Sequence, residues 1–247
     1  MVENITLDAL WNQAAPARTS FDPAMVAHLP PQVQRFLSAA IMPGVPLARA
    51  VRLKMSGEIK LKYWHPFEAE QVISWDRGFI WRATAHLSKW VSMTCSDRFI
   101  NGEGDRKWSL FGVIPMIEEA GQDFSLSSCA RMELEASWLP TVLVSPDVDW
   151  RVSGRSIFAH LQIFGHESEI EFLMNPDGDL TFMAVERWGD VAGDGYFDST
   201  DFGSLVVHRQ MFNGITVPST ICAGWNPKVA GFDGEFIRCT VESAEFK

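Results

Sequence analysis

The stretch of residues 51–63 constrains the fold most, because its side chains alternate between apolar and polar without a break. One face of the stretch carries Val51, Leu53, Met55, Gly57, Ile59, Leu61 and Tyr63. A side-chain period of two is the geometry of a β-strand, and a single water-facing side is typical of an antiparallel sheet or a sheet edge. Residues 64–66 (Trp-His-Pro) cannot continue a ladder, because proline lacks the N–H. Since a second extended run follows at 67–74, we predict a long hairpin with an aromatic corner.

Strand patterns continue through most of the chain. Extended runs at 78–86, 90–100 and 108–114 precede a second series that begins at Trp150. Dipeptides that tolerate positive φ predict tight turns, and they stand at Asn101-Gly102, Asp177-Gly178, Asn213-Gly214 and Asp233-Gly234. We therefore expect a mainly β fold, with a large antiparallel sheet of about ten to eleven strands that forms an open or half barrel.

Helices are predicted in two places. Residues 1–46 contain a short helix capped by Thr6 or Asp8 and a second helix that Pro30-Pro31 opens and Pro43-Gly44 ends. This stretch is too short to bury a core of its own, so we interpret it as a helical lead-in that packs on the sheet. A further helix at 125–138 interrupts the strand series and is expected to cross one face of the sheet. The predicted organisation is a lead-in at 1–46 and a single half-barrel domain at 47–247.

Charge and composition exclude several classes of function. The formal net charge of −10 argues against sequence-independent nucleic-acid binding and against anionic membrane surfaces, both of which need clustered Lys and Arg. No apolar run is long enough to span a membrane, and the N-terminus lacks the pattern of a secretory signal, so a cytoplasmic location is expected. The four cysteines form no C-x-x-C pair and are expected to be free thiols. The 17 Phe and 10 Trp indicate either thick core layers or a lined cavity.

Sequence motifs for cofactors and metals are missing. There is no G-x-G-x-x-G, no P-loop and no H-E-x-x-H, so no nucleotide cofactor and no metal are expected. Asp190, Asp194, Gly195 and Asp201 match part of a calcium-loop pattern, but Ala192 occupies its third position. We interpret this segment as an acidic surface loop.

Candidate site residues are polar side chains that stand where the alternation of their strand is apolar, because burying such a group costs free energy unless it has a partner. Gln71, Asp97, Glu186 and Arg209 meet this criterion. If these four side chains line one cavity, they would orient a polar ligand group there. They would perform acid–base chemistry if burial raised the pKa of a carboxyl. Alternatively, each is structural, as a buried Glu–Arg pair often is. His65, at the aromatic corner, is the best histidine candidate, although a solvated turn histidine fits as well.

Several short motifs resemble those of a bacterial family of unknown function, over about residues 30–247. They are Trp64-x-Pro66-Phe67-x-Ala69-Glu70-Gln71, Phe79-x-Trp81, Asp97, Gly102-x-Gly104 and Glu135-x-x-Trp138-Leu139-Pro140. The resemblance implies a half-barrel related to lipoprotein carriers, which hold apolar ligands on a concave sheet under helices, but it implies no reaction. The matching motifs highlight Glu70, Gln71, Trp81, Asp97, Glu135 and Trp138. The sequence departs from the family pattern near 198–202, where a Pro-Trp element is expected.

Three hypotheses of function follow. In the first, the protein binds a small hydrophobic or aromatic molecule in an apolar cavity with a buried polar cluster, and the ligand-binding residues are Gln71, Glu70, Trp81, Trp138, His65 and Phe67. In the second, it is a cofactor-independent lyase, isomerase or hydrolase whose catalytic residues are Asp97, Glu186, Glu135 and Arg209. In the third, it is a structural protein with a filled barrel, in which the polar residues form a satisfied network. Binding ranks first because no nucleophile or metal motif is visible, while catalysis and the oligomeric state stay open.

Overall fold

The computed structural model describes residues 5–176, 178–228 and 232–247. Within them, thirteen strands pair antiparallel into one sheet. The strands are β1 Ala50–Lys60, β2 Trp64–Ser74, β3 Gly78–Ser88, β4 Val91–Ile100, β5 Glu103–Leu110, β6 Ile114–Ala120, β7 Asp149–Ser153, β8 Ser156–Ile163, β9 His166–Met174, β10 Leu180–Gly189, β11 Asp198–Phe212, β12 Ile215–Trp225 and β13 Glu235–Phe246. The prediction of a mainly β, antiparallel, open sheet is confirmed, whereas the predicted number of ten to eleven strands is too low.

The order of strands in the sheet is β6-β5-β4-β3-β2-β1-β13-β12-β11-β10-β9-β8-β7. The first six strands therefore run from the centre to one edge, and the last seven run from the other edge back to the centre. The two edge strands, β6 and β7, are consecutive in the sequence and do not pair with each other. The connection between them contains helix α3, Gln122–Leu134, and two short 3-10 helices, η2 Glu135–Trp138 and η3 Pro140–Val144.

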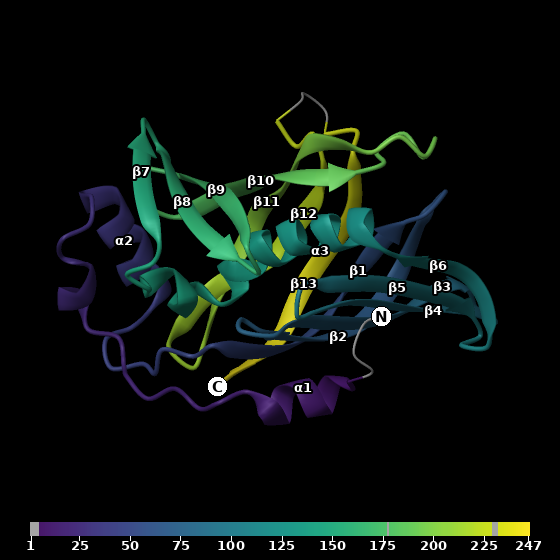
Figure 1. Cartoon of the computed structure of the whole chain (residues 1–247), viewed down its shortest axis with the longest axis horizontal. Coiled ribbons are helices and arrows are strands. Elements are labelled where there is room, and N and C mark those ends of the chain that lie inside the picture. Colours follow the sequence, from purple (N-terminus) through teal and green to yellow (C-terminus); the bar gives the residue numbers. More distant parts are fainter. Residues whose placement is uncertain (1–4, 177, 229–231) are drawn as a thin grey trace.

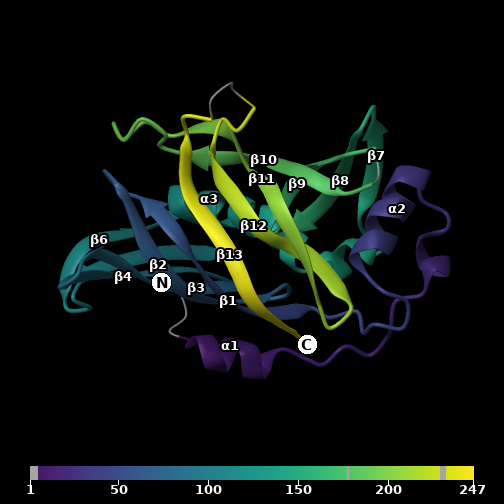
Figure 2. The same cartoon turned by 180° about the vertical axis from the view of Figure 1, so that it is seen from behind.

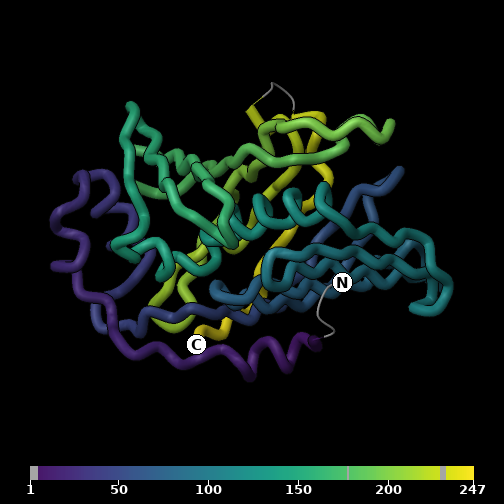
Figure 3. The backbone as a smooth tube through the Cα atoms, viewed as in Figure 1, coloured from purple at the N-terminus to yellow at the C-terminus, as the bar shows by residue number. Residues whose placement is uncertain are grey.

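This connection must cross one face of the sheet, because its two ends are the two sheet edges. Helix α3 contacts β4, β5 and β6 from one half of the sheet and β9 and β10 from the other half. Figure 1 shows the helix lying between these two halves, and the tube in Figure 3 follows the same path. We call the side of the sheet that faces α3 the inner face, and the opposite side the outer face. The predicted helix across the sheet is thus confirmed.

The lead-in helices cover two separate parts of the sheet, as Figure 2 shows from behind. Helix α1, Leu7–Gln13, is capped by the Thr6 hydroxyl and packs Leu7 and Leu10 against the outer face of β2, β3 and β4. After the 3-10 turn η1, Pro23–Val26, helix α2, Pro31–Ala40, places Phe36 5.0 Å from the Phe172 ring. No described helix is long and apolar enough to cross a membrane.

Local predictions fail where a turn lacks its usual residues or a strand tolerates an unusual one. The run 108–114 is not one strand: the chain turns at Phe111 and Gly112, both at positive φ, and β5 and β6 result. The prediction that Pro66 stops the ladder is also wrong, because Pro66 pairs with Glu58 of β1. Pairing of β2 with β3 begins only after Pro66, so this residue has a strand neighbour on one side alone.

The predicted tight turns have different outcomes. Asn101-Gly102 and Asn213-Gly214 adopt positive φ at both residues and close the β4–β5 and β11–β12 hairpins, as predicted. Asp233-Gly234 lies instead within a longer connection between β12 and β13. Asp177 lies outside the described residues.

Candidate functional site

One row of directly paired residues crosses six strands on the inner face. The strand register places Gln71 opposite Trp81, Trp81 opposite Asp97, and Asp97 opposite Arg106. The row begins at Leu53 on β1 and ends at Glu119 on β6. Directly opposite residues of antiparallel strands point to the same face with their Cβ atoms about 5 Å apart, so neighbouring side chains of this row touch.

A polar stripe on α3 and η2, within the connection between β6 and β7, faces this row. Asp123, Ser127, Arg131 and Glu135 follow each other at intervals of four, which places them on one side of α3 and its continuation η2. The Arg131 guanidinium reaches a carboxylate in each direction: Nη1 lies 3.0 Å from Oδ2 of Asp97, and Nε lies 2.8 Å from Oε1 of Glu135. The stripe and the row are therefore joined by a buried ion pair.

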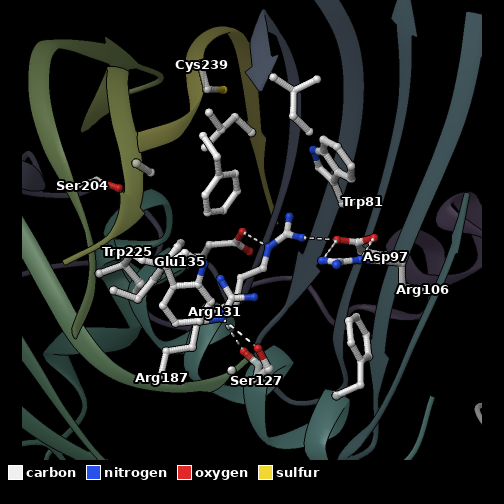
Figure 4. Close-up of a pocket in the computed structure, with 18 of the residues that line it drawn as sticks. Trp81, Asp97, Arg106, Ser127, Arg131, Glu135, Arg187, Ser204, Trp225 and Cys239 are labelled. Carbon is white, nitrogen blue, oxygen red and sulfur yellow. Dashed lines mark hydrogen bonds and ion pairs between the residues drawn. The ribbon is translucent and has the colours of Figure 1, made fainter. Parts of the chain in front are cut away.

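Asp97 is the centre of the resulting network, which Figure 4 shows in part. Besides Arg131, its oxygens accept hydrogen bonds from Nε and Nη2 of Arg106, at 3.0 and 3.1 Å, and from Nε1 of Trp108 at 3.2 Å. Asp97 is 3% exposed, and burial alone would raise the pKa of its carboxyl. The attraction of Arg106 and Arg131 outweighs this effect and holds the pKa of Asp97 below its usual value.

The network ends at an amide. Oε2 of Glu135 accepts a hydrogen bond of 2.5 Å from Nε2 of Gln71, which is fully buried. The order of partners is thus Arg106, Asp97, Arg131, Glu135 and Gln71. The network ties α3 to the inner face. It also satisfies the two buried carboxylates, because every oxygen of Asp97 and Glu135 accepts a hydrogen bond.

A cavity of about 750 Å³ lies between α3 and the inner face. This volume is within the range of small-molecule sites in proteins. Its wall is rich in aromatic side chains: Trp81, Trp108, Phe124, Trp138, Phe197, Phe202, Trp225 and Phe236. The space under the helix is therefore not filled by the protein's own side chains.

Arg187 comes from β10, in the other half of the sheet, and also lines the cavity. It is 6% exposed, and its Nε donates to the backbone oxygen and the hydroxyl of Ser127, at 3.1 and 3.0 Å. The guanidinium lies over the rings of Phe202, at 4.4 Å, and Trp225, at 5.2 Å. Among the described residues, its two terminal nitrogens have no hydrogen-bond partner and no carboxylate at ion-pair distance. Burial, with repulsion from Arg131 and Arg106, lowers the pKa of Arg187 to about 9.

Three further polar atoms on the cavity wall have no partner. Oε1 of Gln71 and the hydroxyls of Ser137 and Ser204 are buried without a hydrogen bond in the described part of the protein. A buried polar atom without a partner costs free energy, and because these three are covered by protein, a change of rotamer toward the cavity would supply one.

The mouth of the cavity is acidic. Glu118, Glu119 and Asp123 are exposed there, and Asp190 begins the loop with the calcium-like pattern. The Asp190 carboxylate accepts N–H bonds from residues 193, 194 and 195, at 2.7, 3.1 and 2.8 Å. It therefore closes its own surface loop. Across the described ranges, no group of three or more His, Cys, Asp or Glu side chains is placed to hold a metal ion.

Five of the ten predicted site residues line the cavity: Gln71, Trp81, Asp97, Glu135 and Trp138. Phe67 lies behind them in the core, with its ring 6.0 Å from that of Trp81. His65 is half-buried opposite Ile59 and does not line the cavity. Glu70 lies on the outer face, where one of its oxygens is 2.6 Å from Nε of Arg52. The structure therefore does not bring His65 and Glu70 to this cavity.

Glu186 and Arg209 are not brought to the cavity either. Residues 182–185 of β10 are buried on both faces, so their apolar pattern does not tell which face is inner. Glu186 is exposed on the outer face, and its neighbour Arg187 points inward instead. Arg209 forms an ion pair with Asp179 and lines a separate pocket of about 20 Å³.

Sequence reasoning missed Arg106, Arg131, Ser127 and Arg187. The four-residue spacing of Ser127, Arg131 and Glu135 on a predicted helix is a signal that would have placed the first two beside Glu135. Arg106 would have followed from the Asn101-Gly102 hairpin, which sets Asp97 opposite it. No signal in the sequence separates Arg187 from Glu186.

Comparison with known proteins identifies a family but no activity. The chain belongs to DUF6920, a family of unknown function whose model matches residues 27–246, which confirms the resemblance to an uncharacterised family. A search of curated proteins found no match.

Two solved structures are similar in fold. One is a domain named for outer membrane lipoprotein sorting, from Vibrio parahaemolyticus, at 5% identity and a TM-score of 0.43, over 80% of this chain and 85% of that one. The other is a LolA superfamily protein from Nitrosomonas europaea, at 8% identity and a TM-score of 0.44, over 87% of this chain and 92% of that one. At this distance, neither a ligand nor an activity carries over.

Proposed function

We propose that this member of the DUF6920 family binds a small hydrophobic or aromatic molecule in the cavity under α3. The observation that supports this proposal most is the cavity itself, about 750 Å³ in volume and walled by eight aromatic side chains. Aromatic walls with a few placed polar groups are typical of small-molecule sites, because the apolar surface supplies affinity and the polar groups fix orientation. Gln71, Ser137 and Ser204 belong to the same wall, and their unpartnered atoms would meet a ligand after a change of rotamer.

Binding is favoured over catalysis because the predicted acid–base residues are already engaged. Asp97 receives bonds from two guanidiniums and an indole, and its pKa is held low. Glu135 is bonded to Arg131 and Gln71. A general base needs an oxygen that is free to take a proton, whereas both oxygens of each of these carboxylates already accept hydrogen bonds from neighbouring side chains. A filled barrel, in turn, would leave neither this volume nor these unpartnered atoms.

The proposal is tested by titrating the purified protein with Nile red, a neutral apolar dye whose fluorescence rises in apolar surroundings. We expect saturable binding of one dye molecule per chain. Ala223 is buried in the cavity wall, so an Ala223→Phe variant places a ring in the space and is expected to weaken binding about tenfold or more. Ala39, exposed on α2, supplies the matched control Ala39→Phe, which leaves binding unchanged.

Two results would contradict the proposal. One is the absence of saturable dye binding by the folded protein. The other is an Ala223→Phe variant that keeps its fold, judged by circular dichroism, and binds the dye as tightly as the unsubstituted protein, since the dye would then occupy another surface.

A further inference from the structure

We infer that the ligand of this cavity carries a single negative charge, and that its carboxylate binds the terminal nitrogens of Arg187. The inference rests on the function proposed above and adds the chemical class of the ligand, an apolar molecule that ends in a carboxylate. It is carried by the placement of Arg187, a buried cation in the cavity wall with donors that no described residue uses.

The first argument is the incomplete hydrogen bonding of Arg187. A guanidinium has five N–H donors, and within the described part of the chain only Nε of Arg187 has partners, both on Ser127. The rings of Phe202 and Trp225 cover the flat side of the group and leave its edge free. The terminal nitrogens of an arginine form a fork that matches the two oxygens of a carboxylate, so the open edge is a site for a planar anion.

The second argument is the count of charges in the part of the cavity away from its mouth. Among the described residues that line the cavity away from its exposed mouth, three carry a guanidinium, Arg106, Arg131 and Arg187, and two carry a carboxylate, Asp97 and Glu135. Both carboxylates lie within the network of Arg106 and Arg131. One positive charge is left over, and it is located on Arg187. A monoanion neutralises this excess, whereas a phosphate monoester, with nearly two negative charges, would exceed it.

The acidic mouth does not oppose this assignment. Glu118, Glu119 and Asp123 are exposed to water, where physiological salt screens charges over about 8 Å. Glu119 lies 3.4 Å from Arg106, at the outer end of the network, and is not at ion-pair distance from Arg187. Arg187 is buried beyond these groups, and interactions in such surroundings are screened much less.

The test compares two probes with the same apolar chain, dodecanoate and dodecanol, by their displacement of Nile red at neutral pH and physiological ionic strength. We expect dodecanoate to bind about tenfold or more tightly than dodecanol, because a charge-assisted hydrogen bond replaces an unpaired buried cation. In the Arg187→Met variant, dodecanoate is expected to lose this advantage while dodecanol binds as before. Arg209→Met removes the same charge outside the cavity and leaves both affinities unchanged.

The outcomes separate the two proposals. If the acid and the alcohol bind the unsubstituted protein equally, the inference about charge is wrong while the proposed function stands. If neither probe nor the dye binds, the proposed function itself fails. If dodecanoate is preferred but Arg187→Met retains the preference, the anion lies elsewhere and the assignment to Arg187 is wrong. The comparison of acid and alcohol needs no variant, so it decides the charge of the ligand even if Arg187→Met does not fold.

Discussion

Asp97 and Arg106 stand directly opposite each other across β4 and β5, and two nitrogens of Arg106 hold the two oxygens of Asp97 at 3.0 and 3.1 Å. Arg131 approaches the same carboxylate from α3. A single carboxylate thus links the hairpin of the first half-sheet to the helix that crosses to the second half. Its contributions to stability and to the shape of the cavity are open to measurement.

Replacing Asp97 with Asn is expected to destabilise the fold by about 2–3 kcal/mol. The substitution leaves Arg106 and Arg131 without their shared anion, and breaking a buried pair on one side is costly, although both arginines keep some contact with water. Urea unfolding followed by tryptophan fluorescence measures the effect. Asp76→Asn breaks an exposed pair with Arg49 and serves as control, with a loss below about 1 kcal/mol. Equal losses in the two variants would contradict the special role of Asp97.

Stability is also expected to fall in acid through Asp97. A carboxyl whose pKa is lower in the folded than in the unfolded state stabilises the fold above its unfolded pKa, and this contribution disappears as the pH falls through the folded pKa. The loss should therefore begin below about pH 4, the ordinary range of Asp. Unfolding free energies measured from neutral pH into this range should fall less steeply for Asp97→Asn. Parallel curves would show that Asp97 does not carry the acid sensitivity.

Glu133 is expected to act in the opposite direction. It is 5% exposed, and burial raises the pKa of its carboxyl, although a hydrogen bond from Cys129 at 3.5 Å offsets part of this. The cost of burying this carboxyl is therefore complete above its raised pKa, shrinks as the pH falls below that value, and is gone below the ordinary pKa of Glu. Glu133→Gln should raise the unfolding free energy at neutral pH by about 1 kcal/mol, and the gain should shrink in acid. Glu68→Gln, at an exposed position, is the control and should leave the unfolding free energy unchanged. A lower unfolding free energy of Glu133→Gln at neutral pH would contradict the prediction.

Arg187 and Arg131 should respond differently to the same substitution. Arg187→Met removes an unpaired buried charge and keeps an apolar side chain against Phe202 and Trp225, so the ligand-free protein should become more stable by about 1 kcal/mol, despite the lost bonds to Ser127. Arg131→Met breaks two ion pairs and should cost about 2–3 kcal/mol. Thermal unfolding of both variants distinguishes them. Destabilisation of similar size in both would show that Arg187, too, serves the fold alone.

Local sequence patterns predicted much of the sheet and part of the site. The uninterrupted alternation at 51–63 predicted β1 and its hairpin, and apolar alternation placed Gln71 and Asp97 on the inner face, where the structure has them. Family motifs added Trp81, Glu135 and Trp138. These predictions hold because a strand has a period of two wherever it lies, so the face of a residue follows from its immediate neighbours.

What the sequence by itself determined is the class of the fold and the side of the sheet on which these few residues lie. Only the tertiary structure decided that β1 pairs with β13, that Arg131 of α3 meets Asp97 from 34 residues away, and that Arg187 rather than Glu186 points inward. The physical reason is that alternation reports a face only where the other face is wet. At residues 182–185 both faces are buried, and there the choice depends on what the rest of the chain packs against each side.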